Sequence, residues 1–246
     1  MAYAASCTST SSHTRTALVE LYVSGNCRRC PEAQSWLRAI VSRHGKRGSV
    51  IGVVFAPHAL RYASYDEELA ARRQQARRDQ RRARRGLPVP VLGPQVILQG
   101  EERTDWGMPA FDKVLVGLNA QPSPMVLTLE IEPGKAATKA AEQDMRINVR
   151  VDLKHLQEKV ALYVAAAALS TQPGSPALYQ VMEWQGPIPV GSAGKLAVSL
   201  RFPRLDPPQA ARIGAVAFVQ GLSSKVVLQS IHRPPCGVPG AEGAPA

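Results

Sequence analysis

Residues 17–31 read ALVELYVSGNCRRCP, and this stretch decides how the rest of the chain is interpreted. Residues 17–23 are apolar apart from Glu20 and include β-branched members, so they predict a buried strand. Residues 24–26 predict a tight turn. The chain then enters Cys-Arg-Arg-Cys at 27–30. Two cysteines with this spacing, placed between a strand and a helix, indicate a dithiol or disulfide with redox chemistry.

The helix that follows is predicted for residues 27–44. Its apolar face repeats every three or four residues, and Pro31 suits its first turn. A helix N-terminus carries a partial positive charge, which favours a thiolate at the first cysteine. We therefore expect Cys27 to be the attacking thiolate and Cys30 the resolving thiol. Two alternatives remain for this pair: a structural disulfide, or half of a zinc site that would need two further ligands.

The remaining elements of the first half alternate between strands and helices. The predicted strands cover 50–55 and 91–100, with 101–106 pairing back as a hairpin. Helices are predicted for 62–87 and for 109–119. The order over residues 17–120 is therefore β-α-β-α-β-β-α.

Pro94 is a further candidate site residue, because Gly93-Pro94 leads into the strand at 91–100. X-Pro bonds are the only common cis peptide bonds. We expect a cis bond here that presses the backbone of Pro94 against the dithiol and shapes a substrate groove. An ordinary turn proline is the alternative.

The second half has the pattern of a β protein. Short alternating or apolar runs are separated by Gly- and Pro-rich turns. The predicted strands cover residues 126–131, 145–151, 160–168, 179–184, 196–202, 213–219 and 226–231. These observations predict a flexible lead at 1–16, an α/β domain at 17–121, a β-sandwich domain at 122–233 and a flexible tail at 234–246.

The chain also resembles a known family. The segments that carry the resemblance are residues 19–31, Gly93 to Ile97 with Gly100, residues 214–220 and the late Cys236. Together they resemble the bacterial thioredoxin-like family catalogued as domain of unknown function 1223, from about residue 18 to residue 236. The resemblance implies an α/β thioredoxin-like domain followed by an all-β, Ig-like sandwich domain, which is the expected fold class. It also implies export to the periplasm or secretion.

The resemblance assigns one more residue and has two gaps. Thioredoxin-like enzymes have an acid near this point of the strand that relays a proton to the second cysteine, which implies that role for Glu20. The alternative is a carboxylate at a strand edge or one paired with an arginine. The second strand runs into Ala-Pro-His-Ala-Leu at 56–60 instead of the family's aromatic and acidic run. Residues 171–195 also lack the family's Gly-Glu-Asn…His stretch, so this chain is expected to bind a different substrate or to have lost one.

The other two cysteines lie near the two ends of the chain, at Cys7 and Cys236. Four cysteines allow three pairings, and the most economical one joins Cys27 to Cys30 and Cys7 to Cys236. Chain termini of a domain often lie close together, which favours the long-range bond.

The charge balance is strongly basic, with 30 Lys and Arg against 19 Asp and Glu, a net charge of +11. Much of the excess lies in the predicted helix at 62–87. Among its arginines are Arg73, Arg77, Arg78, Arg81, Arg82, Arg84 and Arg85. They indicate either a solvated face or a site for an anionic partner such as nucleic acid, anionic lipid or an acidic protein. Aromatic residues make up only 5% of the chain, which is few for a surface that binds single-stranded nucleic acid by base stacking.

The sequence carries only weak indications of a membrane segment, a signal peptide, or a cofactor or metal site. No apolar run reaches the roughly 18–20 residues of a membrane helix, so we expect no integral membrane segment. No intact signal peptide is visible, which leaves the cytoplasm as an alternative to export. The five histidines show no ligand spacing, and no phosphate-binding loop appears, so no cofactor or metal is predicted.

The leading functional interpretation is a thiol–disulfide oxidoreductase that acts on a protein or small-molecule disulfide. One alternative is a non-catalytic binding module in which the disulfide only holds a loop. The other is an arginine-driven binder of anionic partners.

Overall fold

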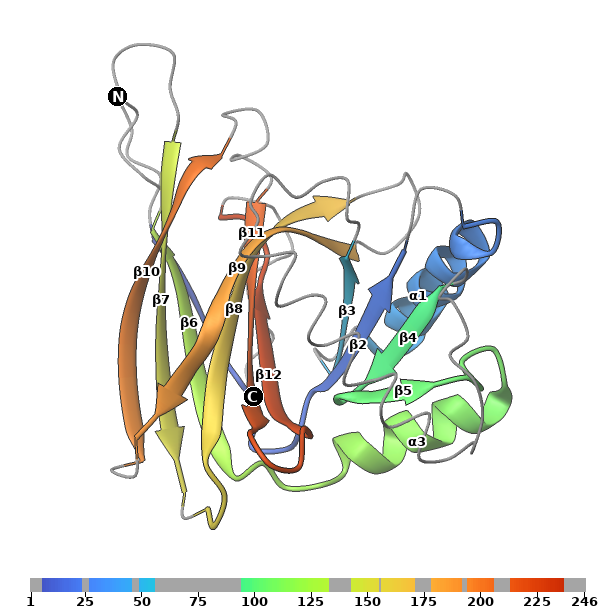
Figure 1. Ribbon diagram of the computed structural model, residues 1–246, viewed down its shortest axis with the longest axis horizontal. Helices are drawn as coiled ribbons and strands as arrows, with labels where there is room; N and C mark the ends of the chain where they lie inside the picture. Colours follow the sequence, from blue (N-terminus) through green and yellow to red (C-terminus); the bar gives the residue numbers. More distant parts are fainter. Residues whose placement is uncertain are drawn as a thin grey trace.

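The computed structural model describes residues 6–23, 27–45, 49–55, 94–132, 143–154, 156–170, 178–191, 194–205 and 213–236. Within these ranges the chain forms twelve strands and two helices (Figure 1). The described part of the protein is therefore mostly β.

The first half forms most of the elements that its hydrophobic pattern predicts. They are β2 (Ala17–Tyr22), α1 (Cys30–His44), β3 (Val50–Phe55), β4 (Gln95–Leu98), β5 (Glu101–Arg103) and α3 (Pro109–Asn119). Strands β2 and β3 are buried at every position, which explains why they read as continuous apolar runs rather than alternating ones. Helix α1 begins at the second cysteine, three residues later than predicted.

The seven strands predicted for the second half are all present, most of them longer than predicted. They are β6 (Met125–Glu132), β7 (Gln143–Leu153), β8 (Val160–Ser170), β9 (Leu178–Val190), β10 (Lys195–Leu205), β11 (Ile213–Gly221) and β12 (Val227–Arg233). A further strand, β1 (Cys7–Thr10), lies in the predicted lead and pairs with β6 in antiparallel register.

The strands form two sheets. The smaller has the order β1-β6-β7-β10, and the larger has the order β12-β11-β8-β9-β3-β2-β4-β5. The two halves of the chain meet inside the larger sheet, where β3 pairs in parallel with β9 through Val53–Tyr179 and Val54–Gln180. One sheet thus runs from the first half of the chain into the second.

The expected fold class, an α/β thioredoxin-like domain followed by a separate Ig-like sandwich domain, is therefore wrong. Two separate units would each close their own sheet, whereas the eight-stranded sheet belongs to both halves. The physical reason lies in β3, which is buried on both faces and whose second edge needs backbone hydrogen bonds. The first residues of β9 supply them.

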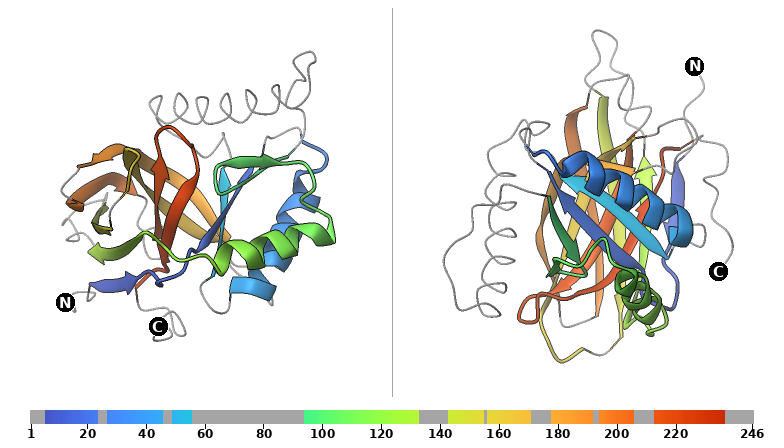
Figure 2. Two further views of the ribbon diagram at one scale, coloured as in Figure 1. Left: turned by 90° about the horizontal axis from the view of Figure 1, so that it is seen from below. Right: turned by 90° about the vertical axis from the view of Figure 1, so that its right-hand side faces the viewer.

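The elements form layers on the eight-stranded sheet (Figures 1 and 2). Along β9, Leu178 packs in the core beneath the helices, and Met182, on the same face of the strand, packs against the core beneath the four-stranded sheet. The helices and the four-stranded sheet therefore cover two parts of one face. The other face carries an apolar core that includes Tyr163, Trp184 and Phe218.

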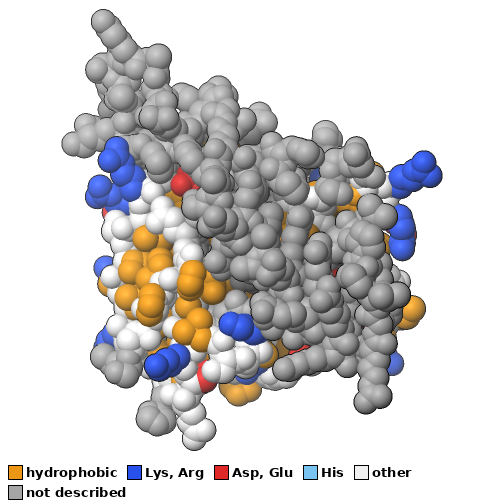
Figure 3. All heavy atoms as spheres, in the orientation of Figure 1, with side chains coloured by type: hydrophobic (Ala, Val, Ile, Leu, Met, Phe, Trp, Pro, Cys, Tyr) orange, Lys and Arg blue, Asp and Glu red, His pale blue; other side chains and the backbone are white. Residues whose placement is uncertain are grey.

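At strand β10 the core between the two sheets lies near the surface. Strand β10 ends the order of the smaller sheet, and the side chain of Gln185 on β9 donates a hydrogen bond to the Arg201 carbonyl at 2.8 Å. Apolar side chains gather on this side of the molecule (Figure 3). Those of Leu196, Val198 and Leu200 are only partly buried, so the edge of the core reaches the surface here.

Helix α1 lies very close to β3. At Gly52 an added Cβ would lie 2.8 Å from a Val41 methyl group and 3.2 Å from Leu37. Both contacts are with α1, so a glycine at this position allows the helix to approach the sheet. This packing fixes the direction of α1 and therefore the position of its N-terminus.

Candidate functional site

The candidate site is a disulfide between Cys27 and Cys30, with a Cα–Cα distance of 5.4 Å. It lies where the chain passes from the carboxyl end of β2 into α1. Cys30 is the first residue of the helix, and its backbone N–H donates to the Cys27 carbonyl at 3.3 Å. The two residues are 7% and 5% exposed. The predicted bond is confirmed, and both of its cysteines are buried.

The start of α1 supplies a positive end beside the disulfide. The helix is 15 residues long, begins with proline in its first turn and has no side-chain cap at Arg29. Pro31 carries no N–H, and the Cys30 N–H donates to the Cys27 carbonyl outside the helix. The aligned peptide dipoles of the helix still place their positive end at this turn. Their combined partial charge is about half an elementary charge, which favours a thiolate at this end.

The two arginines between the cysteines have different surroundings. Both are exposed. The Arg29 guanidinium pairs with Glu32 at 3.2 Å and lies over the Trp106 ring, 5.3 Å from its centre. Arg28 forms no ion pair with any residue in the described ranges. The charge of Arg28 therefore faces solvent next to Cys27.

An aromatic cluster, formed by Trp36, Trp106 and Phe111, flanks the disulfide. The Trp36 ring lies 5.2 Å from Trp106 and 5.0 Å from Phe111. Trp106 belongs to the same buried cluster as the two cysteines. Trp36 lies on the repeating apolar face of the helix, but nothing in the sequence connects Trp106 with the dithiol, because contacts between distant segments leave no spacing signal.

The loop that carries Trp106 is held by an ion pair between Arg103 and Asp105, with two nitrogen–oxygen distances of 2.8 and 2.6 Å. These hydrogen bonds raise the pKa of Arg103 and lower the pKa of Asp105. Since the pair is neutral overall, it adds structure near the site without adding charge.

Glu20 does not join the cysteines. Side chains alternate along a strand, and Val19 and Leu21 are the residues of β2 that pack in the cluster with Cys27 and Cys30. Glu20 lies on the opposite face of the sheet, fully buried, where it accepts a hydrogen bond of 2.7 Å from the Tyr22 hydroxyl. A proton passed from Glu20 to Cys30 would have to cross the sheet.

Pro94 lies at the same end of the sheet as the disulfide. It immediately precedes Gln95, which pairs with Tyr22 at the carboxyl end of β2. Pro94 is partly buried. The expected cis bond also involves Gly93, which is outside the described residues, so the cis form stays a prediction.

The second disulfide joins Cys7 in β1 to Cys236 after β12, with a Cα–Cα distance of 5.8 Å. The predicted pairing is confirmed. It connects two residues 229 positions apart. All four cysteines of the chain are therefore in disulfides.

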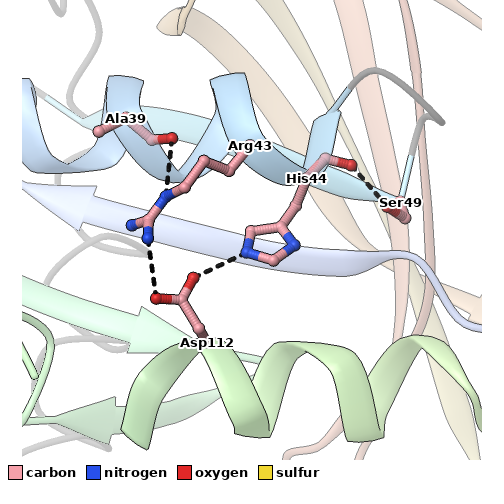
Figure 4. Close-up of polar contacts among 5 residues, drawn as sticks. All are labelled: Ala39, Arg43, His44, Ser49 and Asp112. Carbon is pink, nitrogen blue, oxygen red and sulfur yellow. Dashed lines mark hydrogen bonds and ion pairs between the residues drawn. The ribbon is translucent and has the colours of Figure 1, made fainter. Parts of the chain in front are cut away.

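A polar cluster joins the two helices at their surface (Figure 4). Asp112 of α3 accepts hydrogen bonds from Arg43 at 3.1 Å and from the His44 ring at 2.7 Å, and the Ser49 hydroxyl donates to the His44 carbonyl. The sequence predicts only that His44 suits the helix end. Since Asp112 of α3 bonds to two residues at the end of α1, the cluster serves as a clamp between the helices.

A further polar pair lies on the other face of the large sheet. The Tyr179 hydroxyl lies 2.7 Å from His232 Nδ1, and the Tyr179 ring passes over Gly214, where an added Cβ would lie 3.1 Å away. Burial raises the pKa of Tyr179, and burial together with Arg233 lowers the pKa of His232 to about 4. The phenol and a neutral imidazole therefore share a hydrogen bond at pH 7.

The arginine-rich helix predicted at 62–87 lies outside the described residues, as do the seven arginines named for the anionic partner. No helix in the described part of the chain is long and apolar enough to cross a membrane.

The family model described as protein of unknown function (DUF1223) matches residues 18–220. The chain belongs to this family. The match includes the Cys27–Cys30 disulfide and stops short of Cys236, and the family's description names no activity. No curated protein matches the sequence significantly.

Two solved structures have a similar fold. HBP35 of Porphyromonas gingivalis matches with a TM-score of 0.64 and 12% identity, over 96% of this chain and 81% of that one. Protein AGR_C_4864 from Agrobacterium tumefaciens matches with a TM-score of 0.52 and 16% identity, over 90% of this chain and 95% of that one. At such identities the likeness concerns the fold alone.

Proposed function

We propose that this DUF1223 protein carries out thiol–disulfide exchange at Cys27 and Cys30. In the reduced protein, the Cys27 thiolate attacks one sulfur of a substrate disulfide, and the other substrate sulfur leaves as a thiolate and takes up a proton. Cys30, after losing its proton, then attacks the Cys27 sulfur of the mixed disulfide and releases the second substrate thiol. The protein ends oxidised and the substrate reduced; the reverse sequence oxidises a dithiol substrate.

The observation that carries this proposal is the position of the disulfide at the start of α1. The helix end favours the thiolate that exchange requires, and the neighbouring Arg28 is exposed. Pro94, at the same end of the sheet, is proposed to form part of the substrate groove. Glu20 has no role in this proposal because it lies across the sheet.

The size of the closed loop also supports a bond that can open without loss of the fold. In the chain-entropy model a loop closed by residues three positions apart contributes only about 2 kcal/mol. The bond between residues 229 positions apart contributes about 5 kcal/mol in the same model. The long-range disulfide is thus suited to stability and the short one to exchange.

The alternative is a structural disulfide that only holds the loop before α1. The low exposure of both cysteines, 7% and 5%, favours this alternative, since a catalytic dithiol must present its first sulfur to a substrate. The two interpretations differ in how readily the bond is reduced.

The deciding experiment is equilibration of the protein with glutathione buffers of graded potential, followed by thiol alkylation and mass mapping. Exchange predicts that Cys27–Cys30 opens at a potential less negative than about −270 mV while Cys7–Cys236 stays closed. A Cys7→Ser and Cys236→Ser double variant should keep the transition, and a Cys27→Ser and Cys30→Ser variant should lose it. A bond that stays closed below about −300 mV would be structural.

We also propose that the protein works in an oxidising compartment, the periplasm or outside the cell. The support is the pairing of all four cysteines, since disulfides persist where thiols are not kept reduced. Fractionation of the native host with an alkylation assay tests this, and free cysteines in a cytoplasmic fraction would contradict it.

The net charge of +11 supports a second, independent proposal, which is that Arg73, Arg77, Arg78, Arg81, Arg82, Arg84 and Arg85 bind an anionic partner. Binding to a polyanion such as heparin should weaken steeply between about 50 and 200 mM salt. Binding that is insensitive to salt would contradict this proposal.

A further inference from the structure

Arg28 and Arg29, the two arginines of the dithiol loop, differ in whether a neighbouring acidic side chain offsets their charge. Glu32 offsets the charge of Arg29, and the guanidinium of Arg29 is also held against Trp106. Arg28 is exposed, follows Cys27 directly and has no ion-pair partner in the described part of the chain. Within the described part of the chain, a substrate sulfur that approaches Cys27 therefore meets the uncompensated positive charge of Arg28.

We propose that Arg28 is a specificity-determining residue that selects disulfides carrying a carboxylate near the reacting sulfur. This inference rests on the proposed exchange at Cys27. An exposed guanidinium attracts an anion during the encounter and can form a charge-assisted hydrogen bond with its carboxylate in the mixed disulfide. The substrate class is thus acidic disulfides, whether small molecules or acidic segments of a protein.

The size of the effect is limited by solvent. An exposed ion pair changes an equilibrium or rate by a factor of roughly two to five at low salt. Salt screens such a pair, so most of the preference should disappear at about 0.5 M ionic strength. The size of the preference at low salt and its loss at high salt can both be measured.

The test uses three small disulfides that differ in charge: cystamine (cationic), bis(2-hydroxyethyl) disulfide (neutral) and 3,3′-dithiodipropionate (anionic). Their intrinsic reactivities differ, so each rate with reduced variant is divided by the rate with reduced wild type. Any change in Cys27 reactivity itself affects all three substrates and cancels when these ratios are compared. The variants are R28S, the charge-conserving R28K and R29S.

R150S is the matched control. It removes the same side chain from an exposed position on β7, opposite Thr128 and Ala197 in the four-stranded sheet. That sheet and the helices cover different parts of the large sheet (Figure 1). R150S therefore changes the net charge equally without changing the dithiol loop.

We expect R28S to slow the anionic disulfide about fivefold relative to the neutral one at low salt and to speed the cationic one. For R28K, the ratio of variant rate to wild-type rate should stay close to one for all three disulfides. R29S should change these ratios less than R28S does, and R150S should leave all of them at one. Equal ratios for all three disulfides with R28S would overturn the inference while leaving exchange intact. If no disulfide reacts with Cys27 in the reduced wild type, the proposed function fails and the inference falls with it.

Discussion

At the scale of single residues, the two arginines of the loop are expected to set the reduction potential unequally. A positive charge near Cys27 stabilises the thiolate, which exists only in the reduced form, and so raises the potential. Each 1.4 kcal/mol of such stabilisation corresponds to about 30 mV. Because Glu32 offsets Arg29, the structure assigns most of the effect to Arg28.

We therefore expect Arg28→Ser to lower the potential by up to about 30 mV, and Arg29→Ser by less. The measurement is equilibration of each variant with glutathione. Equal shifts for the two variants, or a wild-type couple below about −270 mV, would contradict this electrostatic explanation.

His232 predicts how stability depends on pH. Its pKa is about 4 in the folded protein, below the value of about 6.5 expected for the unfolded chain. As the pH falls, the unfolded state therefore binds a proton at a higher pH than the folded state does. The stability contributed by neutral His232 is present above pH 6.5 and is lost as the pH falls towards 4. The loss amounts to about 3 kcal/mol across that window.

His232→Asn keeps an acceptor for the Tyr179 hydroxyl but does not titrate. In urea unfolding at pH 7 and pH 4.5, the wild type should lose stability at the lower pH by a margin that the variant does not show. A parallel decrease in both proteins would assign the acid sensitivity to other groups.

Some of these residues could be predicted from the sequence and others could not. The cysteines were predictable because their spacing carries the chemistry. The face of β2 to which Glu20 points could not be predicted, because the strand is buried on both faces. Only the packing of α1 reveals which of these faces holds the dithiol. The Tyr179–His232 contact joins residues 53 positions apart and leaves no local pattern.

At the scale of elements, the clamp between α1 and α3 makes a testable contribution to stability. Asp112→Asn preserves shape but removes the charge that Arg43 and His44 share (Figure 4). The side chains of Arg43 and Asp112 are 54% and 29% exposed, so solvent screens the pair. We expect a loss of about 1 kcal/mol in denaturant unfolding.

A double-mutant cycle with Arg43→Gln separates the two partners of Asp112. If Arg43 contributes, the coupling energy should be a few tenths of a kcal/mol, and the rest of the loss belongs to His44. A loss well above 2 kcal/mol would mean that Asp112 has a role in the packing of α3 that its partly exposed position does not suggest.

The elements themselves were largely predictable because their hydrophobic periods are strong. Helix α3 and strands β2 and β3 coincide closely with the patterns at 109–119, 17–23 and 50–55. Strand β1 was missed because Cys7–Thr10 is short, polar and stabilised by pairing with β6 rather than by its own pattern. Local composition cannot reveal a partner that is about 120 residues away.

At the scale of the whole molecule, the same limitation explains the wrong fold class. The change from helical to strand patterns near residue 121 is real, and it falls between α3 and β6. Yet a change of pattern does not require a separate sheet. The parallel pairing of β3 with β9 joins segments more than 120 residues apart, and only the three-dimensional structure shows which edges meet.

The long-range disulfide gives the last prediction at this scale. Cys7–Cys236 connects β1 of the small sheet to the segment after β12 of the large one, so it restrains nearly the whole unfolded chain. Replacing both cysteines by serine should cost about 5 kcal/mol in the chain-entropy model, against about 2 kcal/mol for replacing Cys27 and Cys30. Guanidinium unfolding of the two double variants measures the difference.

The order of the two losses is the informative result, because both variants exchange two cysteines for two serines and differ chiefly in the length of chain that is released. If the Cys27 and Cys30 variant loses as much stability as the Cys7 and Cys236 variant, the short disulfide contributes through packing in the native protein rather than through chain entropy. A bond that the fold needs in this way could not open and close in each cycle of exchange. The structural alternative for Cys27–Cys30 would then replace the redox proposal.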